Sequence, residues 1–264
     1  MSEAIFSLTA LIVFVSVLLA VYNNNAVIRK YKLKSDKINK NLRIAVITDF
    51  HNKRYNYGNS YITDKIRSVK PDIIIIAGDL VDRRKPDIPV AKELLDKLRE
   101  ISRVFYVTGN HETEIGLEQV LSELDCDPVL LDERYEIYRD YSVLGLSDRE
   151  RDLTSERSDL LGIFEKLPNY KIVVTHRPTE IDDYLKISDY DIDLVITGHT
   201  HGGLIRIPFF GALVCPNEGF FPKYSKGKYN VNGTTLIVSG GLGNTGLPLR
   251  LNNFPEIVVI DIEN

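Results

Sequence analysis

The sequence predicts an α/β fold for residues 42–264, with a single apolar helix in front of it. Three observations lead to this prediction: an uncharged apolar run over Ala4–Val21, short Ile- and Val-rich runs that alternate with amphipathic segments over residues 43–124, and further strand-like runs up to residue 262. The 264 residues are 44% hydrophobic and 27% charged. That balance is typical of a globular protein with a sizeable core, and it excludes a largely disordered chain.

The apolar run is long enough for a membrane helix. At about 1.5 Å per residue it nearly crosses a hydrocarbon core of about 30 Å. A secretory signal would begin with Lys or Arg and end in a small-residue cleavage site, whereas Glu3 precedes this run and Leu18 lies two positions before Ala20. A buried core helix would show a polar face, which the run lacks. We therefore expect an uncleaved anchor over residues 1–25, with the secretory signal and the core helix as alternatives.

Basic residues follow the apolar run. The charged residues of this part of the chain are Arg29, Lys30, Lys32, Lys34, Lys37, Lys40 and Arg43, against Glu3 and Asp36. We expect residues 26–41 to form a basic linker that can rest on anionic lipid headgroups. By the positive-inside rule, the body that follows is expected on the cytoplasmic face of the cell membrane, in a single-pass protein. Because the whole chain has a net charge of −4, the body itself is acidic, which argues against broad nucleic-acid binding.

The body begins with alternating strands and helices. Ile- and Val-rich runs predict buried strands, and apolar residues spaced three or four apart predict helices. The predicted strands are residues 43–48, 72–77 and 104–108, and the predicted helices are residues 59–69, 90–101 and 115–124. Because right-handed crossovers join such units, this half predicts a largely parallel sheet.

The second half is richer in strands. The runs at residues 135–138 and 142–146 indicate paired strands, and helices are expected near residues 158–167 and at residues 180–186. The remaining strands are predicted at residues 171–175, 193–197, 204–207, 228–231, 235–239 and 257–262. No linker or internal repeat divides residues 42–264, so we expect one domain.

Side chains that bind metals follow the predicted strands. All five histidines lie directly after strands or in short turns, and so do two aspartates and an asparagine: His51, His111, His176, His199, His201, Asp49, Asp79 and Asn110. The carboxyl ends of strands are where open α/β sheets bind ligands. A lone histidine would be an ordinary core or surface residue. Five at strand ends predict a metal site.

The donor types indicate which metals bind. Oxygen and imidazole ligands without thiolate suit Mn, Fe, Zn or Co, and the two widely spaced cysteines, Cys126 and Cys215, form no CxxC site. The donors are too many for one ion, whereas two ions that share Asp79 accommodate them all. We therefore expect two divalent cations, an arrangement used for phosphoryl transfer.

The ordered motifs resemble those of the calcineurin-like metallophosphoesterase superfamily. They are DxH at residues 49–51, GDxxD at 78–82, GNHE at 109–112, a single histidine at 176 and GHTH at 198–201. The resemblance spans residues 43–262, which is nearly all of the body. It implies a four-layer αββα sandwich of two mixed sheets, and the predicted order of elements accommodates this fold.

The resemblance also implies roles for single residues. The implied metal ligands are Asp49, His51 and His201 for one ion, Asn110, His176 and His199 for the other, and Asp79 as the bridge. A hydroxide between the two ions would be the nucleophile, and His111 would protonate the leaving group or clamp the phosphoryl oxygens. Asp79 and His111 are thus the expected catalytic residues. Asp82 and Glu112 are expected to support the site and to orient His111, with surface carboxylates near a turn as the alternative.

A closer resemblance is to bacterial, membrane-anchored phosphodiesterases. The shared features are the N-terminal apolar helix, the GHTHGG motif with the LIRIP run at residues 204–208, and the tail over residues 241–257. We expect a phosphodiesterase or pyrophosphate-type hydrolase that acts at the membrane on a lipid-linked or nucleotide-sugar substrate. A phosphomonoesterase is the alternative, followed by a catalytically silent metal-binding module.

Two further groups of residues follow the GHTH motif. Phe209, Phe210, Phe220 and Phe221 are expected either to form an acyl-binding or membrane-facing lip or to pack in the core. Arg206 and Arg250 are expected either to contact substrate phosphate or to form surface salt bridges.

Overall fold

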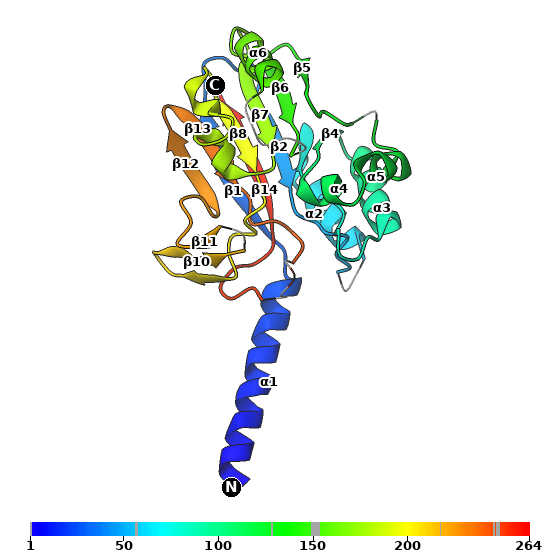
Figure 1. Ribbon diagram of the computed structural model, residues 1–264, viewed down its shortest axis with the longest axis vertical. Coiled ribbons are helices and arrows are strands. Elements are labelled where there is room, and N and C mark those ends of the chain that lie inside the picture. The colour runs from blue at the N-terminus through cyan, green and yellow to red at the C-terminus, as the bar shows by residue number, and fades with distance from the viewer. Residues whose placement is uncertain are drawn as a thin grey trace.

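The computed structural model describes residues 2–55, 58–127, 129–148, 154–216, 218–244, 246 and 249–264. It contains two mixed sheets packed face to face, helices on both outer faces, a small third sheet, and one long helix that projects from the body (Figure 1). The predicted α/β fold of two mixed sheets is confirmed.

The first sheet has five strands, in the order β1-β14-β2-β3-β4. The strands are β1 (Val27–Lys34), β14 (Glu256–Glu263), β2 (Leu42–Ile47), β3 (Ile73–Ala77) and β4 (Arg103–Val107). β1 pairs with β14 in parallel and β14 pairs with β2 antiparallel, whereas β2, β3 and β4 are parallel. The right-handed units predicted for the first half of the body therefore form one side of this sheet.

The second sheet has six strands, in the order β12-β13-β8-β7-β6-β5. They are β12 (Gly227–Val231), β13 (Thr234–Val238), β8 (Leu194–Thr197), β7 (Tyr170–Thr175), β6 (Tyr141–Leu146) and β5 (Arg134–Ile137). The four central strands are parallel and both edge strands are antiparallel to their neighbours. The predicted pairing of residues 135–138 with 142–146 is confirmed.

Three apolar cores separate the layers. Between the sheets, Val46 and Ile75 of the first sheet cluster with Ile172 and Ile196 of the second. All four are fully buried, and each such side chain contributes roughly 1.5–3 kcal/mol to stability. The outer cores lie between each sheet and its covering helices. This stacking is the four-layer αββα sandwich that the resemblance implied.

Amphipathic helices cover the two outer faces. The first sheet is covered by α2 (Ser60–Val69), α3 (Ile88–Arg99) and α5 (Leu117–Leu124), with the short α4 (Asn110–Glu114) before α5. The second is covered by α6 (Ser155–Phe164) and two 3₁₀ turns, η1 (Pro178–Ile181) and η2 (Ile187–Asp189). The helix predicted at residues 180–186 is wrong: η1 ends at Ile181, where Asp182 has a φ of −134°, and Lys186, with a φ of 48°, precedes η2.

The predicted basic linker over residues 26–41 is also wrong. Residues 27–34 form β1, which pairs with all eight residues of β14. Leu33 is buried, while Lys30 and Lys32 are exposed, so the bases belong to the solvent face of an edge strand. Arg29 forms an ion pair with the buried Glu256 at 3.0 Å. The alternation of apolar and basic residues in this segment follows the strand period of two.

The N-terminal apolar run forms α1 (Ser2–Asn24), which stands clear of the body (Figure 1). Side chains along it are exposed, including Phe6 at 76% and Phe14 at 61%, so the alternative of a buried core helix is wrong. Its segment Ile5–Asn24 is apolar and long enough to cross a membrane. The end of α1 is fixed to the body, because the Tyr22 ring packs on Phe254 with centroids 4.6 Å apart.

A small third sheet lies beside the base of α1 (Figure 1). It contains β9 (Ile205–Ile207), β10 (Gly211–Cys215) and β11 (Gly219–Phe220), all antiparallel. The sequence predicted only β9, and the other two strands, each of which begins at a glycine, were not predicted. The four phenylalanines near this sheet are exposed, so their predicted packing in the core is wrong.

Strand direction determines where the functional site lies. β1 leads away from α1, and β14 runs parallel to β1. The strands β2, β3 and β4 run in the opposite direction. The carboxyl ends of β2, β3 and β4 therefore point back toward the end of the body from which α1 emerges. We call this end of the molecule the α1 pole.

Candidate metal centre

The predicted ligands converge at the α1 pole, where the strands end. Asp49 and His51 follow β2, and Asp79 follows β3. His176 follows β7, and His199 with His201 follows β8. Strands of both sheets thus deliver side chains to one place, as the sequence predicted.

The backbone at these strand ends is unusual. Five of the predicted ligands have left-handed backbone conformations: Asp49 (φ 49°), His51 (50°), Asp79 (54°), His199 (67°) and His201 (51°). Each such conformation costs on the order of 1–3 kcal/mol for a residue other than glycine, and it persists where the surrounding structure enforces it. The fold therefore maintains these side-chain positions at the expense of stability.

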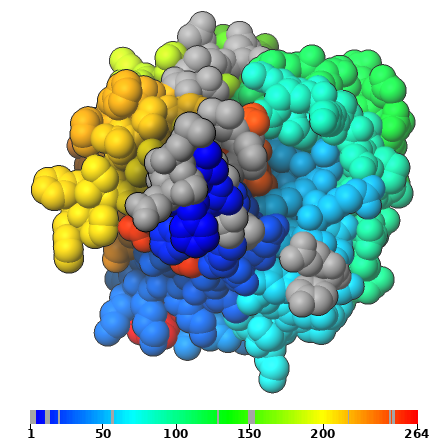
Figure 2. All heavy atoms as spheres, turned by 90° about the horizontal axis from the view of Figure 1, so that it is seen from below, coloured from blue at the N-terminus to red at the C-terminus, as the bar shows by residue number. Residues whose placement is uncertain are grey.

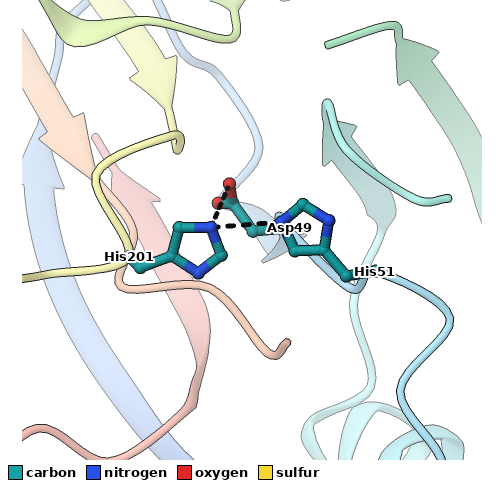
Figure 3. Close-up of side chains that lie close together, drawn as sticks. All are labelled: Asp49, His51 and His201. Carbon is teal, nitrogen blue, oxygen red and sulfur yellow. Dashed lines mark hydrogen bonds and ion pairs between the residues drawn. The ribbon is translucent and has the colours of Figure 1, made fainter. Parts of the chain in front are cut away.

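One group of donors comprises Asp49, His51 and His201, shown in Figure 3. The Nε2 atoms of His51 and His201 are 3.1 Å apart, and His201 Nε2 lies 3.4 Å from Asp49 Oδ1. All three side chains are buried. Donor atoms from the ends of β2 and β8 thus face one small volume.

A second group comprises Asp79, His176 and His199. His176 Nε2 lies 3.2 Å from Asp79 Oδ2 and 3.2 Å from His199 Nδ1. The Nδ1 atom of His176 is hydrogen-bonded to the carbonyl of Ala77 at 2.9 Å, which orients the ring with Nε2 toward the site. Gly78 allows this approach, since a Cβ at that position would collide with the His176 ring.

The carboxylate of Asp79 joins the two groups. Its Oδ2 is 3.2 Å from His176 Nε2 in the second group and 3.7 Å from His51 Nε2 in the first. Its Oδ1 accepts a hydrogen bond from the backbone N–H of His111 at 2.9 Å. This is the position that a ligand shared by two ions requires.

The donor set fits two divalent cations. Burial holds the pKa of His51 down to about 3 and the pKa values of His199 and His201 well below their ordinary value, so these rings are neutral, which is the form of imidazole that binds metals. Asn110 Oδ1 is buried and has no hydrogen-bond partner among the described residues. A buried amide oxygen beside neutral imidazoles suits a divalent cation.

The buried carboxylates of Asp49 and Asp79 also have shifted pKa values. Burial raises the pKa of Asp49 to about 6, because its carboxylate is removed from water. Burial acts in the same direction on Asp79, but His176 and the neighbouring histidines hold its pKa well below the ordinary value. For His176, burial is outweighed by Asp79 and Asp49, and its pKa is raised to about 10. Two buried carboxylates so close together favour positive charge beside them, which divalent cations would supply.

His111 lies beside the two groups with a defined tautomer. Its Nδ1 accepts a hydrogen bond from the backbone N–H of Arg83 at 3.1 Å, and its Nε2 is 3.8 Å from Asp79 Oδ2. Burial lowers the pKa of His111, so the ring is neutral near pH 7. A neutral ring that accepts at Nδ1 carries its proton on Nε2, which faces the site.

Glu112 and Asp82 support the site in ways that differ from the expectation. The buried carboxylate of Glu112 accepts hydrogen bonds from the backbone N–H groups of Asp79, Val81 and Gly109, at 2.8–3.1 Å, and so holds two motif loops together. Asp82 is bound by Arg84, and its Oδ1 is 3.6 Å from His111 Nδ1. The hydrogen bond that orients His111 comes from the backbone of Arg83, with the Asp82 carboxylate next to it.

The two arginines expected at substrate phosphate have structural partners instead. The Arg250 guanidinium is buried and donates to the carbonyls of Gly240 and Gly243. Arg206 donates to the carbonyl of Gly202 and the hydroxyl of Ser225. Both hold glycine-rich loops around the site, which corrects the prediction of phosphate contact as well as the alternative of surface salt bridges.

Other arginines lie where an anion would arrive. A cavity of about 180 Å³ at the donor groups is lined by His51, Asp79, Arg83, Arg84, Asn110, His111, His199, His201, Pro216 and Gly246. Arg177 also reaches the donors: it binds Asp148 through two hydrogen bonds, and its Nη1 is 2.8 Å from His199 Nε2. These arginines were not among the residues predicted from the sequence. Their positions in the sequence could have identified them, because Arg83 directly follows the GDxxD motif and Arg177 directly follows His176.

Comparison with known proteins identifies relatives. The family model for calcineurin-like phosphoesterases matches residues 42–203. The metallophosphoesterase YkuE of Bacillus subtilis is 32% identical over 213 residues, which cover 75% of this chain and 70% of that protein. A metallophosphoesterase of Aquifex aeolicus is 29% identical over 273 residues, covering 95% and 98%. The phosphodiesterase YaeI of Escherichia coli is 25% identical over 229 residues, covering 83% and 82%.

Solved structures show the same fold. A dimetal phosphatase from Danio rerio matches with a TM-score of 0.53 at 13% sequence identity, over 78% of this chain and 89% of that one. The donor groups at the strand ends, the family match and the relatives agree. This chain belongs to the calcineurin-like phosphoesterase family and is a metal-dependent phosphoric ester hydrolase.

Proposed function

We propose that this chain is a membrane-anchored phosphodiesterase or pyrophosphate-type hydrolase that works with two divalent cations. The observation that carries the proposal is the pair of buried donor groups joined by the Asp79 carboxylate. Asp49, His51 and His201 would hold one cation, Asn110, His176 and His199 the other, with Asp79 shared. When bound, such a pair lowers the pKa of water and neutralises charge on phosphoryl oxygens.

The residues of the chain position the ester and stabilise its charge. Arg83 and Arg84 line the cavity and can bind the phosphoryl oxygens, while the Arg84–Asp82 contact fixes the direction of that side chain. His111 lines the same cavity, where its neutral ring can donate a hydrogen bond from Nε2 to a phosphoryl oxygen or to the departing oxygen. The second ring nitrogen stays bound to the Arg83 backbone and keeps the tautomer fixed.

The room beside the donors supports a diester. A second hollow of about 310 Å³ shares His51, Arg84 and Gly246 with the first, and Lys53 and Lys85 line it as well. A monoester needs only the space at the donors, whereas a diester or pyrophosphate has a second substituent that this hollow can receive. The similarity to the phosphodiesterase YaeI agrees with this assignment.

We assign α1 as an uncleaved anchor and place the body on the cytoplasmic face. The apolar length of Ile5–Asn24 and the bases that follow it on β1 support this assignment. Because β1 belongs to the first sheet, the catalytic domain begins at about residue 26. The predicted boundary at residue 42 would cut through the sheet.

The assay uses the full chain in detergent, loaded with Mn²⁺, on bis-p-nitrophenyl phosphate and on p-nitrophenyl phosphate. We expect faster cleavage of the diester, with loss of both activity and metal in Asp79→Ala. The matched control is Asp64→Ala, which removes an exposed aspartate on α2 and should change neither. A preference for the monoester would favour the phosphomonoesterase, and absence of hydrolysis with two metals bound would favour the silent module.

A further inference from the structure

Four phenylalanines form an exposed apolar surface on the third sheet. Phe209, Phe210, Phe220 and Phe221 are exposed by 106%, 78%, 75% and 64%. Among the described residues outside α1, no other large hydrophobic side chain is as exposed. Isolated apolar residues are common on protein surfaces, but clustered aromatic rings of this exposure mark a surface that binds a partner. We call these four residues the phenylalanine surface.

The backbone holds two of these rings outward at an energetic cost. Phe209 has a φ of 69° and Phe221 a φ of 49°, conformations that bulky residues rarely adopt. Phe209 and Phe210 lie in the turn between β9 and β10, and Phe220 and Phe221 lie at β11. Two separate turns therefore present aromatic pairs to the outside.

The phenylalanine surface and α1 are attached to the same segment of the body. Ile205 of β9 bridges to Leu251, and Phe254, three residues further on, packs against Tyr22 of α1. Asn252 donates to the carbonyl of Arg206, which ties β9 to this segment again. Figure 2 looks along α1 from its free end and shows the yellow segment that follows residue 200 projecting beside the blue helix.

The third sheet also reaches the metal centre. His199 and His201 directly precede β9, and Pro216, in the connection between β10 and β11, lines the cavity at the donors. Lys53, two residues after His51, donates to the carbonyl of Asn23 near the end of α1. The donor groups are therefore connected both to the end of α1 and to the third sheet.

We propose that the phenylalanine surface inserts into the headgroup and upper acyl region of the same lipid bilayer that α1 crosses. The inference rests on the proposed anchoring by α1. With α1 as one attachment and the four rings as a second, the body cannot swing freely about the anchor. The cavity is then held toward the bilayer, where a phosphoester carried on a lipid headgroup can reach the donors. Aromatic rings are favoured at such an interface.

Tryptophan fluorescence tests this contact, because the chain contains no tryptophan. Single variants Phe209→Trp and Phe220→Trp, on different turns, are placed in the full chain, in vesicles of phosphatidylethanolamine and phosphatidylglycerol with or without brominated acyl chains. The control is Ile163→Trp, at an exposed position on α6 far from α1 (Figure 1). We expect brominated lipid to remove most of the emission at 209 and 220 and none at 163.

Flotation of the same vesicles separates the outcomes. Chain that floats, with emission at 209 and 220 as insensitive to bromine as at 163, would overturn the lipid contact while leaving the anchor intact. Chain that does not float would overturn the anchor and, with it, this inference. Hydrolysis of the soluble diester tests the phosphodiesterase proposal separately, because that assay requires no lipid.

Discussion

The position of His111 indicates a role in catalysis rather than in metal binding. Its Nε2 proton faces the cavity, and its other nitrogen is held by the Arg83 backbone. We expect His111→Ala to keep its metals and to lose about a hundredfold or more in turnover, the range for a positioned hydrogen-bond donor to developing negative charge. His51→Ala is the comparison, because it removes a predicted ligand and should lose metal together with activity. Metal content and turnover of both variants are measured, and full activity in His111→Ala would contradict the assigned role.

Glu256 is a fully buried charged residue that is expected to contribute to stability. Its buried carboxylate meets Lys226 Nζ at 2.8 Å, Arg29 Nε at 3.0 Å and the backbone N–H of Gly240. Removing one partner of such a buried group leaves the other uncompensated, so Glu256→Gln should lower the free energy of unfolding at pH 7 by about 3 kcal/mol. The control on the same strand is Glu263→Gln, whose exposed pair with Lys32 should change it by about 0.5 kcal/mol or less.

The Glu256 effect should depend on pH in one direction. Burial raises the pKa of this carboxyl, but Lys226, Gly240 and Arg29 together lower it below the ordinary value of 4.5. The carboxylate therefore contributes stability above about pH 4.5, and the contribution is lost as the pH falls through the lowered folded-state pKa. Denaturant unfolding at a series of pH values should show the parent and Glu256→Gln converging in acid, and a constant difference would contradict the pairing.

Single residues show what can be predicted from sequence and what cannot. Asp49, Asp79 and His199 could be predicted as ligands because each follows its own strand. The role of Arg177 could not, because it depends on Asp148, 29 residues away on another segment. Arg250 was assigned to substrate because a free arginine near a phosphate site is expected to bind it, yet burial among loop carbonyls gives it a different task.

Among the elements, β1 has the clearest consequence for experiments. It contributes one edge of the first sheet and covers β14 along all eight residues. We expect a chain without residues 1–25 to stay folded and soluble. A chain without residues 1–37 should unfold at lower temperature or aggregate, because it exposes β14 as an unpaired edge and loses the buried Leu33. Thermal unfolding and diester hydrolysis of both truncated chains decide this, and equal behaviour would restore the linker interpretation.

The strands that were not predicted lack the dense apolar runs that identify the core strands. Strands of the core could be predicted from dense runs of Ile and Val, as at residues 72–77, because both faces are buried. β1 alternates lysines with apolar residues, and its partner β14 lies more than 220 residues away in sequence, so only the folded chain shows the pairing. β10 and β11 bury little and have no strong pattern of their own.

At the scale of the whole molecule, the relation between anchor and site comes from strand direction. The sequence could predict the anchor and the ligands, but not that both lie at the α1 pole, because this depends on the parallel pairing of β1 with β14 and the reversal at β2. An anchor at the opposite end would have turned the cavity away from the bilayer. The fold thus determines which end of the body faces the bilayer. Which side of the membrane the body occupies is a separate question.

The side of the membrane can be measured with one introduced thiol. The two native cysteines, Cys126 and Cys215, are buried, so Ile163→Cys supplies an exposed thiol on the body. With the body in the cytoplasm, a membrane-impermeant maleimide should label this thiol in inverted membrane vesicles and leave it unlabelled in intact spheroplasts, because the bases after α1 stay inside. A cysteine at residue 2, at the other end of α1, should show the reverse pattern. Labelling of the 163 thiol in intact spheroplasts would place the body outside. Absence of the chain from the membrane fraction would identify α1 as a cleaved signal.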